Sequence, residues 1–234
     1  MIATTSTTPA AWPPGYRWHA RVPPPSPDTL AFFRNVPAAC IADCLGRSVG
    51  SVGLRAYHGA GAPLCGPALT VRVRPGDNLM IHAAMLAARA GDVIVIDGGA
   101  DLSQALVGDL MRTTAIALQL GGFVIDGAIR DTASWADGRM PVYARGHTPR
   151  GPSKDGPGEI NVPIACAGMA VQPGDLVVGD ADGIVVIGQA DLGWLRDKVA
   201  AQLDRESAIR LQNSSGRPDA ERFMRILRQK GLPV

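Results

Sequence analysis

The chain has 234 residues, of which 46% are hydrophobic and 19% charged, and its formal net charge is +2. This composition supplies the core of one large domain, with or without tails, although aromatic residues are scarce at 5% and aliphatic side chains must fill that core. The near-neutral charge and the lack of a basic stripe with interleaved aromatics argue against nucleic-acid binding, and no apolar stretch reaches membrane-spanning length.

The cysteines and the N-terminus indicate a cytoplasmic protein. The four cysteines are widely spread, form no CxxC pair and have no accompanying histidine cluster, so a zinc site is not indicated. The N-terminus lacks the basic start and apolar run of a signal peptide. We therefore expect reduced thiols and a cytoplasmic location.

Along the chain, the first predicted segment is an arm. Residues 1–25 are rich in Pro, Thr and Ala, which is typical of an extended or disordered segment, and this arm could wrap on a partner subunit. A helix should follow, with Ser26 as its cap and Pro27 in its first position. The sequence AACIADCLGRSVG, from Ala38, indicates a second helix that stops at a glycine.

From Ala68 the pattern changes to alternating strands and helices. ALTVRVR (68–74) predicts a strand, GDNLMIHAAMLAARAGD (76–92) a helix with an acidic first turn and a stop at Gly91, and DVIVIDGG (92–99) a buried strand. GDLMRTTAIALQLGG (108–122) predicts another helix. FVIDG (123–127) predicts the next strand, with a turn at its Asp-Gly pair.

The last third is predicted to be rich in strands and then helical. Short strands are expected in residues 141–146, 161–168, 175–180 and 183–188, where GDADG (179–183) predicts a tight hairpin rather than a calcium loop. A long helix should run from about residue 190 to 211, and a shorter one should close the chain. The sequence thus predicts a single α/β domain at residues 26–189 and a helical segment at 190–234.

Candidate site residues follow two of the predicted strands. Twenty residues separate Asp109 from the adjacent pair Arg130-Asp131, enough for one helix, one turn and one strand. If the strands are neighbours, these residues meet at one edge of the sheet, where α/β proteins tend to bind ligands. The first amides of the helix that opens at GDLM, at Leu110 and Met111, would suit a carboxylate.

Each of these residues also has an ordinary structural interpretation. Asp109 fits a helix cap, and Arg130 fits a surface ion pair with Asp131 as a mere neighbour. Alternatively, Arg130 offers a planar set of donors for a carboxylate or keto oxygen, and Asp131 offers a ligand for Mg²⁺. The combination at this spacing favours the functional interpretation. Successive residues point in different directions, so Arg130 and Asp131 need not pair with each other.

Several segments together resemble a known family. They are GDNLMIHAAMLAARAGDVIVIDGG, GDLM, GFVIDGAIRD, NVPIACAG and VQPGDLVVGDADGIVVI. They are similar to the RraA-like family over roughly residues 36–187, and most similar to its class II pyruvate aldolases, which act on 4-hydroxy-4-methyl-2-oxoglutarate and 4-carboxy-4-hydroxy-2-oxoadipate. The signature of those aldolases is Asp, twenty residues, then Arg-Asp, present here as Asp109, Arg130 and Asp131.

The resemblance implies a fold and an assembly. The fold would be the swivelling α/β/α arrangement as a single domain, with the N-terminal arm and the C-terminal helices added. Subunits would form homotrimers, often paired into hexamers, with active sites between neighbours.

The resemblance also implies a chemistry. Asp131 would bind Mg²⁺ or Mn²⁺ directly and Asp109 would do so through water. Amides from Gly108 to Met111 would hold the substrate carboxylate, and Arg130 would donate to the keto oxygen. The product would be pyruvate, and oxaloacetate decarboxylation would be a side activity. Glu206 of a neighbouring subunit, or less favourably Asp204, would complete the site through water, and Lys154 could meet the distal carboxylate.

A second class of function stays open at the level of sequence. Some RraA-like proteins are non-catalytic regulators that bind a ribonuclease, and this chain could bind such a protein partner. Those regulators typically lack the metal-binding Asp after the Arg, so Asp131 favours a metal-dependent carbon–carbon lyase acting on a small 2-oxo acid. The sequence does not fix the distal half of that substrate.

Overall fold

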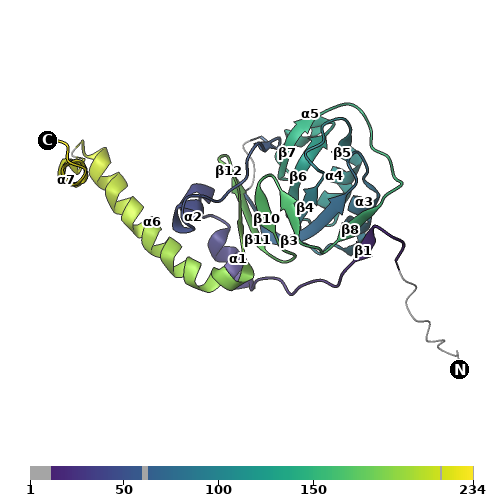
Figure 1. The fold of residues 1–234 in the computed structure, drawn as a ribbon, viewed down its shortest axis with the longest axis horizontal. Helices are drawn as coiled ribbons and strands as arrows, with labels where there is room; N and C mark the ends of the chain where they lie inside the picture. The colour runs from purple at the N-terminus through teal and green to yellow at the C-terminus, as the bar shows by residue number, and fades with distance from the viewer. Residues whose placement is uncertain (1–11, 60–62, 217, 234) are drawn as a thin grey trace, which may run out of the picture.

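The computed structural model describes residues 12–59, 63–216 and 218–233 (Figure 1). A body built around a sheet carries a long C-terminal helix that runs away from it. The helices are α1 (Pro27–Phe33), α2 (Ala38–Cys44), α3 (Leu79–Ala87), α4 (Asp109–Ala117), α5 (Thr132–Trp135), α6 (Leu192–Ser214) and α7 (Ala220–Gln229), with a 3₁₀ turn η1 (Gln189–Asp191) before α6. The strands are β1 (Tyr16–Trp18), β2 (Arg55–Ala56), β3 (Leu64–Val73), β4 (Val93–Asp97), β5 (Ala105–Val107), β6 (Gly122–Ile129), β7 (Val142–His147), β8 (Gly158–Ile160), β9 (Ile164–Cys166), β10 (Met169–Val171), β11 (Leu176–Asp180) and β12 (Gly183–Ile187).

Ten of the strands form one mixed sheet. Its main order is β1-β8-β3-β4-β6-β7-β2, with β5 beside β6 and the β11–β12 hairpin joined to β3. The strands β3, β4, β6 and β7 are parallel to one another. They are rich in Val and Ile because both faces of this part of the sheet are covered. The hairpin turns tightly between Asp180 and Gly183, as predicted.

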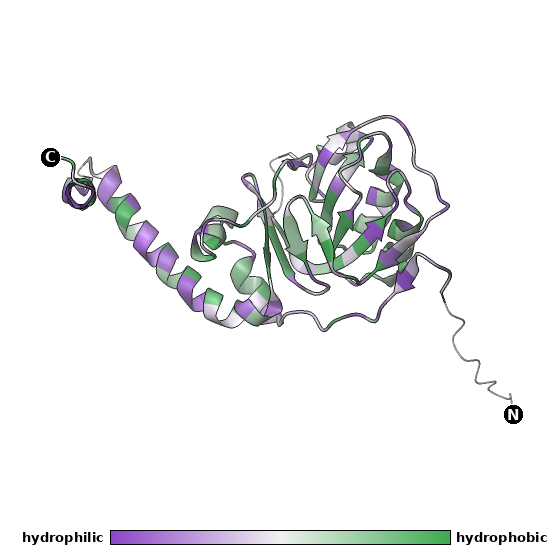
Figure 2. Cartoon of the chain, in the orientation of Figure 1, coloured by the Kyte–Doolittle hydropathy of each residue, from purple (hydrophilic) through white to green (hydrophobic). Residues whose placement is uncertain are grey.

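Three apolar clusters hold the body together. One packs α3, α4 and Trp135 onto one face of the parallel strands, and it includes Ile81, Met111 and Phe123. A second lies around β9 and β10. The third packs α1, α2 and the start of α6 against the β11–β12 hairpin. Hydrophobic colouring is concentrated in the sheet, whereas α6 alternates between hydrophilic and hydrophobic bands (Figure 2).

Two local predictions need correction. The turn expected at Asp126-Gly127 lies inside β6, where the pairing with β7 shifts register between Ile125 and Ala128. This bulge is tolerated because Asp126 pairs with Arg145 and accepts the Ala167 amide at 2.7 Å. The helix predicted from residue 76 begins only at Leu79, so Asp77 precedes it and accepts the Leu79 amide at 3.0 Å, and it ends at Ala87, before Gly91.

The N-terminal segment is partly incorporated into the sheet. Tyr16–Trp18 pairs in parallel with Gly158–Ile160, so this part of the expected arm forms an edge strand. Of the other residues of the predicted arm, 12–15 and 19–25 form no helix or strand, and 1–11 lie outside the described residues. Ser26 caps α1 as expected, accepting the Thr29 amide at 3.2 Å.

The predicted fold class is confirmed. Helices pack on a large sheet, strands and helices alternate in the middle of the chain, and two helices close it. Among the described residues, none of the helices is both long and apolar enough to span a bilayer.

Candidate functional site

The three residues of the predicted signature converge in space. β5 leads into α4 at Asp109, and the neighbouring strand β6 leads into α5 at Asp131. The Asp109 amide donates to Asp131 Oδ2 at 2.9 Å, and Arg130 Nε lies 3.6 Å from the same oxygen. The strand ends therefore meet at one edge of the sheet, as the spacing predicts. The sequence did not require Arg130 and Asp131 to pair with each other, and in the structure they form a loose ion pair.

The turn that carries Arg130 and Asp131 is fixed by its backbone. The Arg130 amide donates to the Val107 carbonyl at 3.0 Å, which ties the end of β6 to the end of β5. Asp131 adopts a left-handed conformation, with φ 58°, and its carbonyl accepts the Ser134 amide at 3.0 Å. Because so few non-glycine residues adopt this conformation, the strain is typical of a position held by its surroundings.

Gly108 is required by close approach. A Cβ at this position would lie 2.6 Å from Asp131 Oδ2 and 2.9 Å from Arg130 Nε, so any other residue would displace the Arg130 and Asp131 side chains from their present positions. As the N-cap of α4, Gly108 has no side chain to bond the first-turn amides. The amides of Leu110 and Met111 have no partner within the helix and are suited to an anion. The Asp109 amide, expected to bind substrate, instead bonds Asp131.

A small cavity of about 120 Å³, here called the inner cavity, lies at this end of α4. It is lined by Gly108, Leu110, Met111 and Arg130, four of the predicted site residues. Lys154, suggested from sequence as a contact for the distal carboxylate, lines the same cavity. The structure therefore places a cation from the 151–158 loop and the Arg130 guanidinium around one space.

Two inner-cavity residues were not predicted to bind ligand. Asn78 is 3% exposed, and its amide nitrogen donates to the Leu106 carbonyl at 2.9 Å, while its Oδ1 is buried without a hydrogen-bond partner among the described residues. A buried acceptor without a partner is costly, so a ligand donor would stabilise it. His82 also lines the cavity, and burial, followed by the Lys154 charge, lowers its pKa. Neither residue stands in a spacing that the sequence could have flagged.

A more open cavity, here called the outer cavity, lies on the other side of Arg130. It measures about 540 Å³ and is lined by Arg130, Asp131, residues 132–134 and residues 147–149. The side chains of Arg130 and Asp131 are 38% and 43% exposed, so solvent and a ligand reach both. Arg130 therefore lines two cavities, a small one at the start of α4 and a larger, more open one beside α5.

A buried arginine adjoins the site and was missed by the sequence analysis. Arg112, one turn after Asp109 on α4, has a side chain only 5% exposed. Its Nη1 donates to Asp109 Oδ1 at 3.3 Å, and its Nη2 donates to Asp137 Oδ2. The Arg112 hydrogen bond is the largest cause that holds the pKa of Asp137 far below its usual range.

The predicted contribution of Glu206 is not made within one chain. Glu206 lies on α6, which leaves the body on the side away from α4 and α5 (Figure 1). It accepts a hydrogen bond from Gln202, and its charge adds to the burial that raises the pKa of Cys40 on α2 to about 11. Asp204, the second candidate, lies on the same helix and is exposed. Either carboxylate reaches a site only on another subunit.

The donors present fit a hydrated magnesium or manganese ion. No cluster of three or more His, Cys, Asp or Glu side chains that could hold a metal occurs among the described residues. Mg²⁺, however, is commonly held by one or two carboxylates and keeps several waters. Asp131, which is exposed to the outer cavity, and Asp109 beside it match that donor set.

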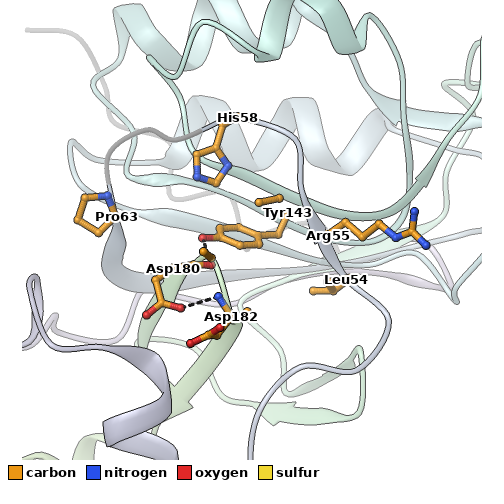
Figure 3. A pocket seen from close by; sticks show the side chains of 11 residues that line it. Leu54, Arg55, His58, Pro63, Tyr143, Asp180 and Asp182 are labelled. Atoms are coloured by element: carbon orange, nitrogen blue, oxygen red, sulfur yellow. Dashed lines mark hydrogen bonds between the residues drawn. The ribbon is translucent and has the colours of Figure 1, made fainter. Parts of the chain in front are cut away.

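A separate cavity of about 590 Å³ lies at the opposite end of β7, and none of the predicted site residues line it (Figure 3). The Tyr143 hydroxyl donates to the Asp180 carbonyl at 2.9 Å, and the Asp180 carboxylate accepts the Asp182 amide at 2.9 Å. The Val142 amide donates to His58 Nδ1 at 3.1 Å, and burial lowers the pKa of His58. These polar groups are satisfied within the fold, so we assign them a structural role.

Comparison with known sequences identifies the family. The profile of the RraA-like family, described as Aldolase/RraA, matches residues 38–186. A relative from Halalkalibacterium halodurans is 42% identical over 186 residues, which cover 78% of this chain and 89% of the relative. Its name is "Putative 4-hydroxy-4-methyl-2-oxoglutarate aldolase".

Solved structures show the same fold. An uncharacterized protein from Pseudomonas syringae pv. tomato superposes with a TM-score of 0.74 at 27% identity, covering 83% of this chain and 96% of that one. RraAS2 from Streptomyces coelicolor, described as an unusual member of the RNase ES inhibitor RraA protein family, superposes with a TM-score of 0.74 at 26% identity, covering 81% of this chain and 98% of that one. The profile match and the 42% identity together show that this chain belongs to the RraA-like family.

Proposed function

We propose that this protein is a divalent-metal-dependent lyase that cleaves a 4-hydroxy-2-oxo acid to pyruvate. The observation that carries the proposal is the convergence of Asp109, Arg130 and Asp131 at the first turn of α4. Two relatives with the name "Putative 4-hydroxy-4-methyl-2-oxoglutarate aldolase" support the aldolase class. The proposal places two carboxylates, one guanidinium and free helix amides around a single 2-oxo acid.

The 2-oxo acid half of the substrate is assigned to Arg130 and α4. The amides of Leu110 and Met111 bind the carboxylate at the positive end of the helix. Arg130 donates to the keto oxygen, whose negative charge grows as the enolate forms. Mg²⁺ or Mn²⁺ held by Asp131 would add positive charge beside that oxygen.

Cleavage needs a base at the distal hydroxyl, and we assign this role to a water oriented by Asp109. The hydroxyl proton passes to the base while the oxygen forms a carbonyl. The C3–C4 bond then breaks, its electron pair goes to the enolate of pyruvate, and that enolate takes up a proton. Oxaloacetate would be decarboxylated by the same residues, because loss of CO₂ leaves the same enolate.

We assign the distal half of the substrate to Lys154 and Asn78, which line the inner cavity together with Arg130 and the first turn of α4. Lys154 supplies a positive charge there and Asn78 supplies a buried acceptor without a partner. These groups suit a second carboxylate and a hydroxyl. The proposed substrate is therefore a dicarboxylic or tricarboxylic 4-hydroxy-2-oxo acid rather than a monocarboxylic one.

The proposed active form is a homotrimer or a pair of trimers. The helix α6, which carries Glu206, runs away from the part of the body that holds α5, which Asp131 caps (Figure 1), so the site would gain this carboxylate from a neighbouring subunit. It would act on the metal through water. Light scattering at micromolar concentration should give a mass of at least three chains, and an active monomer would contradict this part of the proposal.

The first prediction is metal-dependent pyruvate release. Purified protein, treated with EDTA and then given Mg²⁺ or Mn²⁺, should release pyruvate from 4-hydroxy-4-methyl-2-oxoglutarate and from oxaloacetate in an assay coupled to lactate dehydrogenase. Protein kept in excess EDTA should release none from the hydroxy acid. Undiminished turnover in EDTA would refute the metal-dependent mechanism.

A binding function is the second candidate. It is favoured by the superposition on RraAS2, which is described as a relative of ribonuclease inhibitors. Under this alternative, the protein releases no pyruvate from any 4-hydroxy-2-oxo acid or from oxaloacetate. It would instead lower the cleavage rate of a purified ribonuclease of the E type, and this inhibition would survive Asp131→Ala.

A further inference from the structure

Arg112 is an unusual residue for the inner side of a surface helix. Its side chain is 5% exposed, and a buried guanidinium is costly unless its charge is paired and hydrogen-bonded. The partners that it has are therefore informative. One of them is Asp109, the residue proposed to serve the distal hydroxyl.

The guanidinium joins two carboxylates from different elements. Nη1 donates to Asp109 Oδ1 at 3.3 Å, and Nη2 donates to Asp137 Oδ2, which follows α5. The planar arrangement of donors on arginine allows both bonds at once, whereas a lysine ammonium is a single point of charge. The guanidinium carbon also lies 6.0 Å from the centre of the Trp135 ring.

Asp137, which accepts a hydrogen bond from Arg112, is itself held in place by Arg139. Asp137 Oδ1 accepts the Arg139 amide at 3.0 Å, and Oδ2 accepts Arg139 Nε at 2.5 Å. Trp135 is fully buried, and its indole N–H donates to the Arg130 carbonyl at 3.0 Å. The same packed unit therefore contacts both Asp109, through Arg112, and Arg130, through Trp135.

We propose that Arg112, anchored by Asp137, is a positioning residue that holds the Asp109 carboxylate in its working orientation. This inference rests on the function proposed above. The Asp109 side chain is 41% exposed, and its carboxylate has no other side-chain hydrogen bond among those found in the described residues. Without Arg112 it would turn among rotamers open to solvent.

The kinetic test is a double-mutant cycle between Arg112 and Asp109. Arg112→Met should lower kcat about 10–100-fold, the range seen when a residue supporting a site ligand is removed, with little change in KM. In the Asp109→Ala background the same substitution should have no further effect on kcat, because the residue that it orients is absent. Equal losses in both backgrounds would overturn the proposal.

Two further variants distinguish a positioning role of Arg112 from a general loss of folding. Arg112→Lys keeps the charge and should not restore kcat, while Asp137→Asn leaves Arg112 in place and should lower kcat less than Arg112→Met. The matched control is Arg21→Met, which removes another partly buried arginine paired with an aspartate, Asp92, away from the site. It should lower the Tm and leave kcat unchanged.

A crystal structure of Arg112→Met gives a readout that does not depend on activity. We expect the Asp109 carboxylate to move while the backbones of α4 and α5 stay in place. An unmoved Asp109 would overturn the positioning role whatever the kinetics. If the wild-type protein releases no pyruvate, the proposed function fails separately, and this structural readout still decides the role of Arg112.

Discussion

Arg130 and Asp131 are neighbours in the chain, yet their chemistry assigns them different tasks. They lie 3.6 Å apart at their closest charged atoms, and both side chains are more than one-third exposed. An exposed ion pair of this kind contributes little to stability. Their role is therefore more consistent with ligand binding than with stabilising the turn.

Substitutions of Arg130 and of Asp131 should impair different properties of the protein. Arg130→Lys keeps a positive charge but loses the planar donors, so turnover should fall on the order of 10²–10³-fold, the cost of removing a donor to a developing oxyanion. Mn²⁺ affinity, measured by electron paramagnetic resonance, should survive. Asp131→Ala should instead lose both Mn²⁺ affinity and metal-dependent turnover.

The stability of both variants provides the control for this prediction. Arg130 is not buried, so Arg130→Lys should unfold close to the wild type, whereas Asp131→Ala removes the acceptor of the Asp109 amide from a left-handed residue and should lower the Tm modestly without loss of folding. Normal turnover by Arg130→Lys, or full metal-dependent activity of Asp131→Ala, would show that the pair is only a surface feature.

The sequence is sufficient to predict Asp109, Arg130 and Asp131 but not the residues that support them. Parallel strands bring their carboxyl ends to one edge, so spacing alone places the signature together. Arg112 and Asn78 have no such signal. Asp137, the anchor of Arg112, lies 25 residues away, and the unpartnered oxygen of Asn78 is a property of packing.

At the scale of elements, the loop that carries Lys154 is attached to the segment before α3 by the backbone pairing of Ser153 and by the Asp77 carboxylate. Asp77 is fully buried, and its Oδ2 accepts Ser153 Oγ at 2.7 Å, the Asp155 amide at 2.7 Å and the Gly156 amide at 3.1 Å. Burial acts to raise the pKa of Asp77, but these hydrogen bonds and that from Leu79 outweigh it and lower the pKa.

Asp77→Asn should weaken the attachment of this loop while the backbone pairing of Ser153 remains. The substitution keeps the volume but turns an amide group toward donors, and leaving buried donors unpaired costs about 1–3 kcal/mol each. Chemical denaturation should show reduced stability at pH 7, and KM for the hydroxy acid should rise as Lys154 loses its position. Asp155→Asn, at a side chain that is 76% exposed, is the matched control and should change neither.

The pH dependence of this difference follows from the lowered pKa. A carboxyl with a folded-state pKa below its ordinary value of 3.8 stabilises the protein above that value. The wild type loses the contribution as pH falls below 3.8 and through the folded-state pKa. The stability gap between wild type and Asp77→Asn should therefore be widest near neutral pH and narrow in acid, and a constant gap would contradict the assignment.

Elements with strong local patterns were predictable, and those defined by pairing were not. The β-branched run of β4 and the cap of α1 carry their own signals. The strand β1 is recognisable only by its pairing with β8. Asp126-Gly127 has the sequence of a turn, but Asp126 pairs with Asp97 of β4 and the residues before and after the bulge pair with β7, which keeps it within β6, and its charge is balanced by Arg145.

At the scale of the whole molecule, contacts within one chain do not explain why the helix α6 is so long. Its first turns pack on α1 and α2, and beyond Leu203 most of its residues are exposed. Leu211 on α6 and Phe223 on α7 are 75% and 58% exposed. Apolar side chains gathered on a projecting segment are typical of a protein interface. The proposed trimer provides the surface that would cover them.

If α6 carries Glu206 to a neighbour, two inactive variants should restore each other. Asp131→Ala lacks the metal ligand of its own site, and Glu206→Ala lacks the carboxylate given to the next. In mixed assemblies, a complete site forms where an intact Asp131 meets an intact Glu206 across an interface. Co-folded at equal amounts, the pair should recover about one quarter of wild-type turnover, as random placement around a cyclic trimer requires. Each variant alone should be far less active than the mixture.

The control mixture joins Asp131→Ala with Arg130→Lys, whose defects lie in the same half-site and should not complement. Recovery no greater than in that control would show that Glu206 does not act across subunits.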